Sequence, residues 1–241
     1  MRFGVIVGKM GLRERPGFTM VEILVAMGLA TVILAGMVTL FATSNQAYVD
    51  QDQVVAAEQN LRASMEIMAY EFRMAGFIPL DNLPGGPTAI NADVSGQTWT
   101  DGTFERLEEA GSGVITFVSD INADDLAETV RYTLSGNQLL RQSWTWDGAA
   151  WVAQAGGVPV VLAENITGLQ FTYFFADGSS GIPSNADGNT NNDREDVRSM
   201  VMSVSGQTAA MLSGGSRILH SERTLQSRVD MRNMGLDVST K

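Results

Sequence analysis

The fold is decided by the stretch Arg13-Glu-Arg-Pro-Gly-Phe-Thr-Met-Val-Glu22 and the long apolar run that follows it. A basic, mostly polar leader ends at Gly17, and the segment that begins at Phe18 is largely apolar, with Glu22 as its charged residue. A secretory signal peptide carries its apolar core before the cleavage position and is removed with it. Here the candidate processing point, Gly17-Phe18, precedes the apolar core. A processed chain would therefore keep that core as its own N-terminus.

The run from Ile23 to Ala42 contains no charged residue. Roughly 20 residues of helix, at about 1.5 Å each, span a hydrocarbon core of about 30 Å. Basic residues precede the run and acidic residues follow it: Arg2, Lys9, Arg13 and Arg15 before, and Asp50, Asp52 and Glu58 after. The positive-inside bias then predicts a cytoplasmic N-terminus, with the remainder of the chain on the far side of the membrane.

This layout resembles the class III signal of type IV pilins and pseudopilins, carried here by Gly17-Phe-Thr-Met-Val-Glu22. The resemblance implies that prepilin peptidase cuts between Gly17 and Phe18 and that the new N-terminus at Phe18 is methylated. It also implies that Glu22 pairs with the terminal amine of a neighbouring subunit and guides assembly. From the residues alone, Glu22 could equally be an interfacial carboxylate that reaches the lipid headgroups.

Helical periodicity continues beyond the apolar run. Apolar residues recur with spacings of three and four, at Val54, Leu61, Met65, Met68, Phe72 and Ala75, and no proline interrupts residues 18–78. The pattern predicts one continuous helix from about Thr19 to Ala75, stopped by Gly76. We therefore divide the chain into a leader (1–17), a membrane and assembly half of the helix (18–42), an amphipathic half (43–76) and a β-rich domain (77–241).

The β-rich region begins with a connection of little expected regular structure, from Pro79 to Gly113. Short apolar and alternating runs then predict strands at 114–118, 128–134, 138–144, 158–164, 167–175, 197–204 and 224–231. Residues 135–137 predict a hairpin turn, and the strands on either side of Asn165 are expected to follow one another directly. The expected fold class is α+β: a pilin-like arrangement in which the long N-terminal helix packs on an antiparallel sheet domain.

Composition excludes several classes of function. The formal net charge is −11 and the pI is about 4.5, so binding of nucleic acid through a basic surface is not expected. The chain has no cysteine, which excludes thiol catalysis, thiolate metal sites and disulfides. One histidine, His220, and the lack of a Gly-x-Ser-x-Gly elbow argue against a hydrolase, and we expect no enzymatic activity. Adjacent acid pairs such as Glu108-Glu109 and Asp124-Asp125 are expected to be solvated loop charges.

The segment 184–196 is the one stretch that suggests a bound ion. Asp187, Asn189 and Asn191 follow the every-second-residue spacing of a Ca²⁺ loop, with Asp193 and Asp196 as further oxygen ligands. The glycine and the bidentate glutamate of an EF-hand are missing. The alternative interpretation is a polar loop of turn-forming residues.

The tryptophans Trp144, Trp146 and Trp151 are expected to place one or two rings in the core.

Three further stretches resemble the PilW family of minor pilins: Arg223–Asn233, Glu164–Tyr173 and Arg194–Arg198. The second is also shared with J-type pseudopilins of type II secretion. The resemblance implies a minor pilin that is processed by prepilin peptidase, waits in the inner membrane with its β domain in the periplasm, and joins major and minor pilins at the assembly platform of a type IV pilus. The alternatives are a J-type pseudopilin and, more remotely, a single-span membrane protein that displays a binding domain.

Overall fold

The computed structural model describes residues 17–83, 86, 90, 94–97, 104–184, 192–207, 209–211, 217–219 and 222–234. The chain forms two compact units, Met1–Val49 and Asp50–Lys241. Within the first unit every described residue from 17 to 45 is exposed. The core described below belongs to the second unit.

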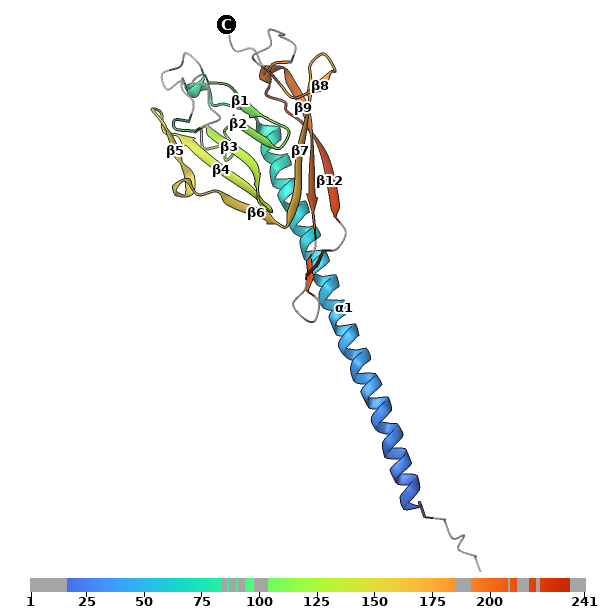
Figure 1. The fold of residues 1–241 in the computed structure, drawn as a ribbon. Coiled ribbons are helices and arrows are strands. Elements are labelled where there is room, and N and C mark those ends of the chain that lie inside the picture. Colours follow the sequence, from blue (N-terminus) through green and yellow to red (C-terminus); the bar gives the residue numbers. More distant parts are fainter. Residues whose placement is uncertain are drawn as a thin grey trace, which may run out of the picture. The chain divides into compact units, whose positions relative to one another are not determined.

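Helix α1 runs without interruption over Met20–Met74 (Figure 1). It ends where the sequence predicts, because Gly76 takes a positive φ of 80°, which is the usual backbone conformation just after a helix. A Cβ atom at this position would lie 3.0 Å from the carbonyl oxygen of Asn233. The Met74 carbonyl, left without a partner inside the helix, accepts hydrogen bonds from Ser119 Oγ at 2.7 Å and from Asn233 Nδ2 at 3.3 Å.

The strands form two main antiparallel sheets, where the sequence had predicted one. The first sheet has the order β1-β2-β3-β4-β5, with β6 also paired to β4: β1 (Leu107–Ala110), β2 (Val114–Ser119), β3 (Glu128–Ser135), β4 (Gln138–Trp146), β5 (Trp151–Ala153) and β6 (Val160–Glu164). The second sheet has the order β12-β9-β7-β8: β7 (Ile166–Phe175), β8 (Ser180–Gly181), β9 (Val197–Gly206) and β12 (Arg223–Asp230). Strands β10 (Ala209–Met211) and β11 (Arg217–Leu219) pair with each other. Three short 3₁₀ turns complete the description: η1 (Leu80–Asn82), η2 (Gln154–Gly157) and η3 (Arg194–Asp196).

The division into two sheets occurs at Asn165. This residue has a φ of 60° and separates β6, which pairs with β4, from β7, which pairs with β9. The hairpin between β3 and β4 is confirmed, with Gly136 at a φ of 58° in its turn. The α+β fold class is likewise confirmed: one long N-terminal helix is followed by antiparallel sheets.

One stripe of α1 is buried against both sheets. Leu61, Met65, Met68 and Phe72 belong to the main core cluster, as the periodicity predicted. The ring of Phe72 makes edge contacts with Phe117 of β2, Tyr132 of β3 and Phe171 of β7, at centroid distances of 5.5, 5.3 and 5.9 Å. Because these rings come from both sheets, Phe72 is the residue at which helix and sheets meet.

A smaller cluster packs on the first sheet opposite the helix. It consists of Ile78, Ile90, Val118, Ala127 and Trp146. Val118 follows Phe117, which belongs to the main core, and neighbouring strand residues point to opposite faces. The expected irregular connection 79–113 is thus wrong in part, because η1 and β1 lie within it and Ile90 is buried. Trp144 and Trp146 are both buried, as predicted for one or two of these rings.

A buried polar network fixes α1 to the first sheet. Glu71, 6% exposed, accepts hydrogen bonds from Arg141 Nε at 3.0 and 3.1 Å and from the hydroxyl of Tyr132. Burial, reinforced by the Glu71 carboxylate, raises the pKa of Tyr132 well above its ordinary value, so the hydroxyl stays protonated and donates. Tyr132 and Arg141 are cross-strand partners on β3 and β4, which places both on the face that meets the helix.

We expect Glu71→Ala to lower the free energy of unfolding by about 3 kcal/mol, because it leaves the partly buried Arg141 guanidinium without its counter-charge. The measurement is denaturant unfolding of the detergent-solubilised protein, followed by tryptophan fluorescence. Glu66→Ala is the matched control, since Glu66 lies exposed on the same helix, and it should change the value by no more than about 0.5 kcal/mol. Equal losses in the two variants would contradict the role given to the network.

Candidate functional site

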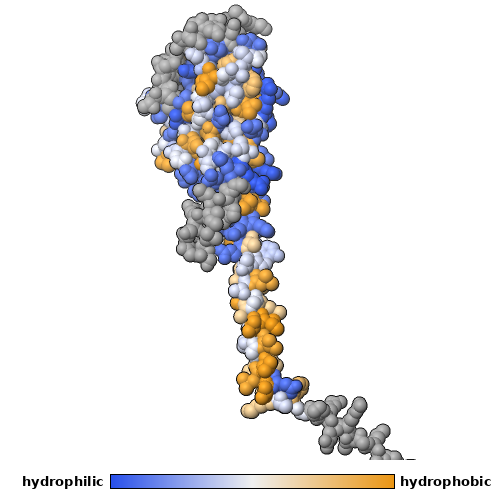
Figure 2. Space-filling view, turned by 45° about the vertical axis from the view of Figure 1, so that its right-hand side comes forward, coloured by the Kyte–Doolittle hydropathy of each residue, from blue (hydrophilic) through white to orange (hydrophobic). Residues whose placement is uncertain are grey.

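The first half of α1 exposes an apolar surface that none of the described residues covers. Figure 2 shows this surface as the run of hydrophobic residues along the helix, and the large side chains from Met20 to Phe41 are all at least half exposed. Among the described residues, α1 is the helix that is long and apolar enough to cross a membrane. A contiguous apolar surface of this length requires lipid or other apolar helices around it.

Glu22 takes part in a capping box at the start of this helix. Its Oε2 atom accepts a hydrogen bond from the backbone N–H of Thr19 at 3.1 Å, and the Thr19 hydroxyl in turn accepts one from the Glu22 N–H at 3.3 Å. The Thr19 hydroxyl also lies 3.0 Å from the same carboxylate oxygen, to which it donates. Sequence reasoning missed this arrangement, although Thr-Met-Val-Glu has the spacing Ser/Thr-x-x-Glu of the motif.

The Glu22 carboxylate borders an apolar hollow on the helix surface. The hollow encloses about 610 Å³ and is lined by Phe18, Glu22, Ile23, Ala26, Met27 and Ala30. Phe18, the predicted new N-terminus, and Glu22 therefore lie beside the same surface of one chain. A second apolar helix that packed here would bring its own polar groups close to Glu22.

The predicted Ca²⁺ ligands are only partly described. Asp187, Asn189 and Asn191 lie outside the described residues, as does His220. Asp193 immediately precedes the turn η3 and Asp196 is its last residue, and the Asp196 N–H donates to the Asp193 carbonyl at 3.0 Å. Across the described parts of the chain, no three acidic or histidine side chains gather closely enough to hold a metal ion. The Ca²⁺ prediction for residues 184–196 stays a prediction.

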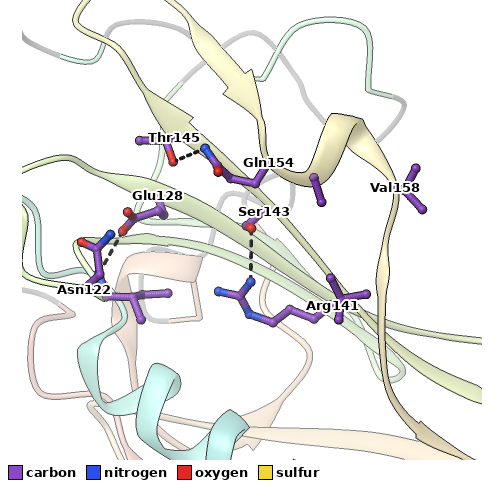
Figure 3. Close-up of a pocket in the computed structure, with 10 residues that line it drawn as sticks. Asn122, Glu128, Arg141, Ser143, Thr145, Gln154 and Val158 are labelled. Atoms are coloured by element: carbon purple, nitrogen blue, oxygen red, sulfur yellow. Dashed lines mark hydrogen bonds between the residues drawn. The ribbon is translucent and has the colours of Figure 1, made fainter.

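A second candidate site lies on the helix-facing side of β3 and β4, and we refer to it as the β3–β4 pocket (Figure 3). It encloses about 380 Å³. Its lining comes from the loop after β2, from β3 and β4, and from η2 with the segment that follows: Ile121, Asn122, Glu128, Arg141, Ser143, Thr145, Gln154, Ala155, Val158 and Val160. Glu128 pairs with Thr145, and Tyr132 pairs with Arg141, so the pocket and the Glu71 network share one face of the sheet.

Glu128 is the acidic residue of the pocket lining, and its pKa is strongly raised. Its side chain is 7% exposed, and Oε2 accepts a hydrogen bond from the Ile121 N–H at 3.0 Å. Its pKa is raised from 4.5 to about 7, mainly by burial. The nearby carboxylates of Asp124 and Asp120 contribute to the rise, and the Ile121 N–H and Arg141 oppose it. At neutral pH this carboxyl is therefore close to half protonated.

The remaining polar groups of the pocket are held in place by hydrogen bonds. Gln154 donates through Nε2 to Thr145 Oγ1 at 2.8 Å, and Arg141 donates through a terminal nitrogen to Ser143 Oγ at 3.2 Å. Figure 3 shows the Ser143 hydroxyl joined to the Arg141 guanidinium, with the Glu128 side chain to one side of both. Fixed polar groups beside a partly apolar wall are typical of small-ligand sites.

Sequence reasoning did not find this pocket. The available signal was Glu128, an acid at the first position of a strand in which apolar and polar residues alternate. The acid pair Glu108-Glu109 was predicted to be solvated loop charge, and this is wrong: both residues lie on β1, Glu108 is 4% exposed, and Glu109 binds Arg131 at 2.9 Å. Asp124 and Asp125 are exposed in a loop, as predicted.

Comparison with known proteins identifies the N-terminal motif. Residues 12–38 match the family model described as the prokaryotic N-terminal methylation motif. A solved structure of a type IV-like pilin from Thermus thermophilus aligns with 73% of this chain and 97% of its own, at 10% identity and a TM-score of 0.40. No curated protein matches the chain in sequence. The matched motif, at the start of an exposed apolar helix that precedes an antiparallel β domain, supports a structural subunit of the pilin or pseudopilin class.

The raised pKa of Glu128 predicts a pH dependence of folding stability. In the unfolded chain the group titrates near 4.5, and in the folded chain near 7. The folded state binds more protons between these values, so its stabilising contribution is complete below pH 4.5 and is lost as pH rises through 7. At about 1.4 kcal/mol per pKa unit, the loss amounts to a few kcal/mol.

We therefore expect Glu128→Gln to flatten the fall in unfolding free energy between pH 5 and pH 8. The measurement is denaturant unfolding at four pH values across this range. Glu164→Gln, which changes an exposed acid on the adjacent strand β6, should leave the slope of the wild type intact. An unchanged slope in Glu128→Gln would show that Glu128 does not titrate near neutrality.

Proposed function

We propose that this chain is a minor pilin-like structural subunit of a type IV pilus, most similar to the PilW family. The observation that carries the proposal is the methylation motif at residues 12–38, placed at the start of a helix whose first half is apolar and exposed. A motif of this kind implies processing by prepilin peptidase and assembly with other pilins. We place the cut between Gly17 and Phe18 and the methyl group on the new Phe18 amine.

Assembly follows from the properties of the helix. After the basic leader is removed, residues 18–42 would anchor the subunit in the inner membrane. The same apolar surface would then leave lipid by packing against the helices of other pilins, where close van der Waals contact between helices replaces contact with lipid tails. In a filament outside the membrane, this packing would also keep the apolar surface away from water. Within a filament, the helices of neighbouring subunits would replace the hydrocarbon chains. The subunit needs no catalytic group for this function.

Glu22 is the proposed assembly contact. The capping box uses its Oε2 atom for the Thr19 N–H. Among the described residues, no protein donor reaches Oε1, so this oxygen can accept from the Phe18 amine of a neighbouring subunit. A carboxylate in an apolar environment gains most from such a cationic partner. The proposed orientation, with the N-terminus in the cytoplasm and the β domain in the periplasm, rests on the basic flank before the helix and the acidic flank after it.

The second candidate is a J-type minor pseudopilin of a type II secretion system. Its motivation is the stretch Glu164–Tyr173, which resembles both families and forms the end of β6, the Asn165 reversal and most of β7. Neighbouring genes that encode pilus or secretion components would separate the two candidates. A more remote alternative is a single-span membrane protein that displays its β domain as a binding module and keeps its leader.

Processing is tested by the intact mass and N-terminal peptide map of the protein purified from its native membranes. We expect a chain that begins at Phe18 with an added methyl group. Gly17→Trp, which places a bulky side chain at the cleavage position, should retain the leader. A wild-type chain that still begins at Met1 in a host with an active prepilin peptidase would overturn the pilin and pseudopilin proposals together.

The role of the Glu22 charge is tested by Glu22→Gln. Glutamine can keep the capping box but carries no charge, so we expect normal processing and at least about tenfold less subunit in sheared filaments, the equivalent of about 1.4 kcal/mol. Glu66→Gln serves as the control, because it removes one charge from the exposed face of the same helix. Incorporation of Glu22→Gln at the level of the control would remove Glu22 from the assembly mechanism.

A further inference from the structure

We infer that the β3–β4 pocket binds a primary alkylammonium group, either the side chain of a lysine on a partner protein or a free alkyl diamine. This inference is independent of the proposed filament function, because every residue that lines the pocket belongs to the second unit and the proposed assembly contacts belong to the first. The evidence consists of the hydrogen-bond acceptors that remain in the pocket, its charge, and the position of its apolar wall.

The acceptors come from two sides of the pocket. Oε2 of Glu128 is occupied by the Ile121 N–H, whereas no described protein group donates to Oε1. Gln154 uses its amide nitrogen for Thr145, which leaves its side-chain carbonyl as a second acceptor. The hydroxyl oxygens of Ser143 and Thr145 lie on the strand between them. An ammonium group carries three N–H donors and no acceptor, and it therefore matches a pocket that offers mainly oxygen atoms.

The charge of the pocket also favours a cation. Glu128 faces the carboxylates of Asp120 and Asp124, both close enough to raise its pKa. The positive group that faces Glu128 is Arg141, but its guanidinium is already paired with Glu71 at 3.0 Å. An anionic ligand would have to compete with Glu71 for Arg141 and would be repelled by Glu128 in the lining and by the nearby carboxylates of Asp120 and Asp124. A cation would contact Glu128 directly and would be attracted by the other two carboxylates.

The apolar wall accounts for the alkyl stem. Ile121, Ala155, Val158 and Val160 line the same pocket, and Val158 and Val160 are 66% and 49% exposed. Val158 is seen in Figure 3 on the side away from Glu128 and Asn122. A chain of methylene groups could lie along these valines while its terminal ammonium reaches Glu128, in the way that lysine side chains bury their stems and keep their charge hydrated or paired. A bare metal ion would leave this wall uncovered.

Binding should be coupled to proton release. An ammonium ligand binds the ionised form of Glu128, whose pKa is about 7 in the free protein. Affinity should then fall by up to about tenfold for each pH unit below 7 and level off above it. A neutral ligand such as an alkyl diol would show the opposite trend or none, because it gains nothing from the ionised carboxylate.

The test is isothermal titration calorimetry of the full-length protein in detergent micelles at pH 6, 7 and 8. The probes are 1,5-diaminopentane, a short lysine-containing peptide with blocked termini, and 1,5-pentanediol as the neutral control. We expect saturable binding of at least one amine, affinity that rises with pH, and no measurable binding of the diol. Tighter binding of the peptide identifies a protein side chain as the ligand, and tighter binding of the diamine identifies a free amine.

Glu128→Gln should weaken amine binding at least about tenfold. Loss of folding would not explain this result, because the variant is expected to be as stable as the wild type at pH 8 or more so. Asp147→Asn, which changes an exposed acid outside the pocket lining, should bind as the wild type does. Equal binding of amine and diol, an unchanged affinity in Glu128→Gln, or no binding of either amine would each overturn the inference.

Discussion

The burial of one stripe of α1 between two sheets is the constraint on which the β domain depends. Neither sheet has a complete core without the helix, because the rings of Phe117 and Tyr132 from the first sheet and of Phe171 from the second all make edge contacts with Phe72. Removing this one ring would leave a cavity bordered by both sheets, and large-to-small changes at such positions cost about 3–5 kcal/mol. The same helix carries, in its first half, an apolar surface that is exposed over residues 17–45 within the described part of the chain. Core packing and assembly thus use different segments of one continuous element.

The interior is not purely apolar. Its polar groups form a series that runs from the contact between α1 and the first sheet to the β3–β4 pocket. Glu71, Tyr132 and Arg141 satisfy one another at the helix–sheet contact. Arg141 also donates a hydrogen bond to Ser143 on the same face of β4. Ser143 and Thr145, the next residue on that face, line the β3–β4 pocket together with Glu128. A buried ion pair contributes little net stability, but it penalises any register or rotation that separates its members. The network therefore specifies how the helix is placed on the first sheet, while the pocket beside it keeps an acid that titrates near neutrality.

Local patterns predicted most of the elements. The end of α1 at Gly76, the hairpin around Gly136 and the reversal at Asn165 each depend on a residue that tolerates positive φ, and such residues can be recognised in the sequence. The separation of β6 and β7 into different sheets could not be predicted, because strand alternation does not say which partner a strand chooses. Glu71 was missed for a related reason: an acid on a helix is normally read as solvent-exposed, and its partners lie 61 and 70 residues later. The β3–β4 pocket combines a loop, two strands and a 3₁₀ turn, and no contiguous motif contains it.

The closure of α1 by Asn233 has a consequence for the order of events during export. The Met74 carbonyl receives the Asn233 side chain across a separation of 159 residues, and Arg106 binds the Asn233 carbonyl at 3.1 Å. Contacts between such distant segments form late in folding, because the chain must lose the conformational entropy of closing the long loop before the contacts can stabilise it. In the proposed orientation, a domain delivered from its N-terminal helix onward could not complete the end of that helix until residue 233 had crossed the membrane. Until then the apolar stripe around Phe72 would lack part of its cover, and exposed apolar surface of this kind favours aggregation.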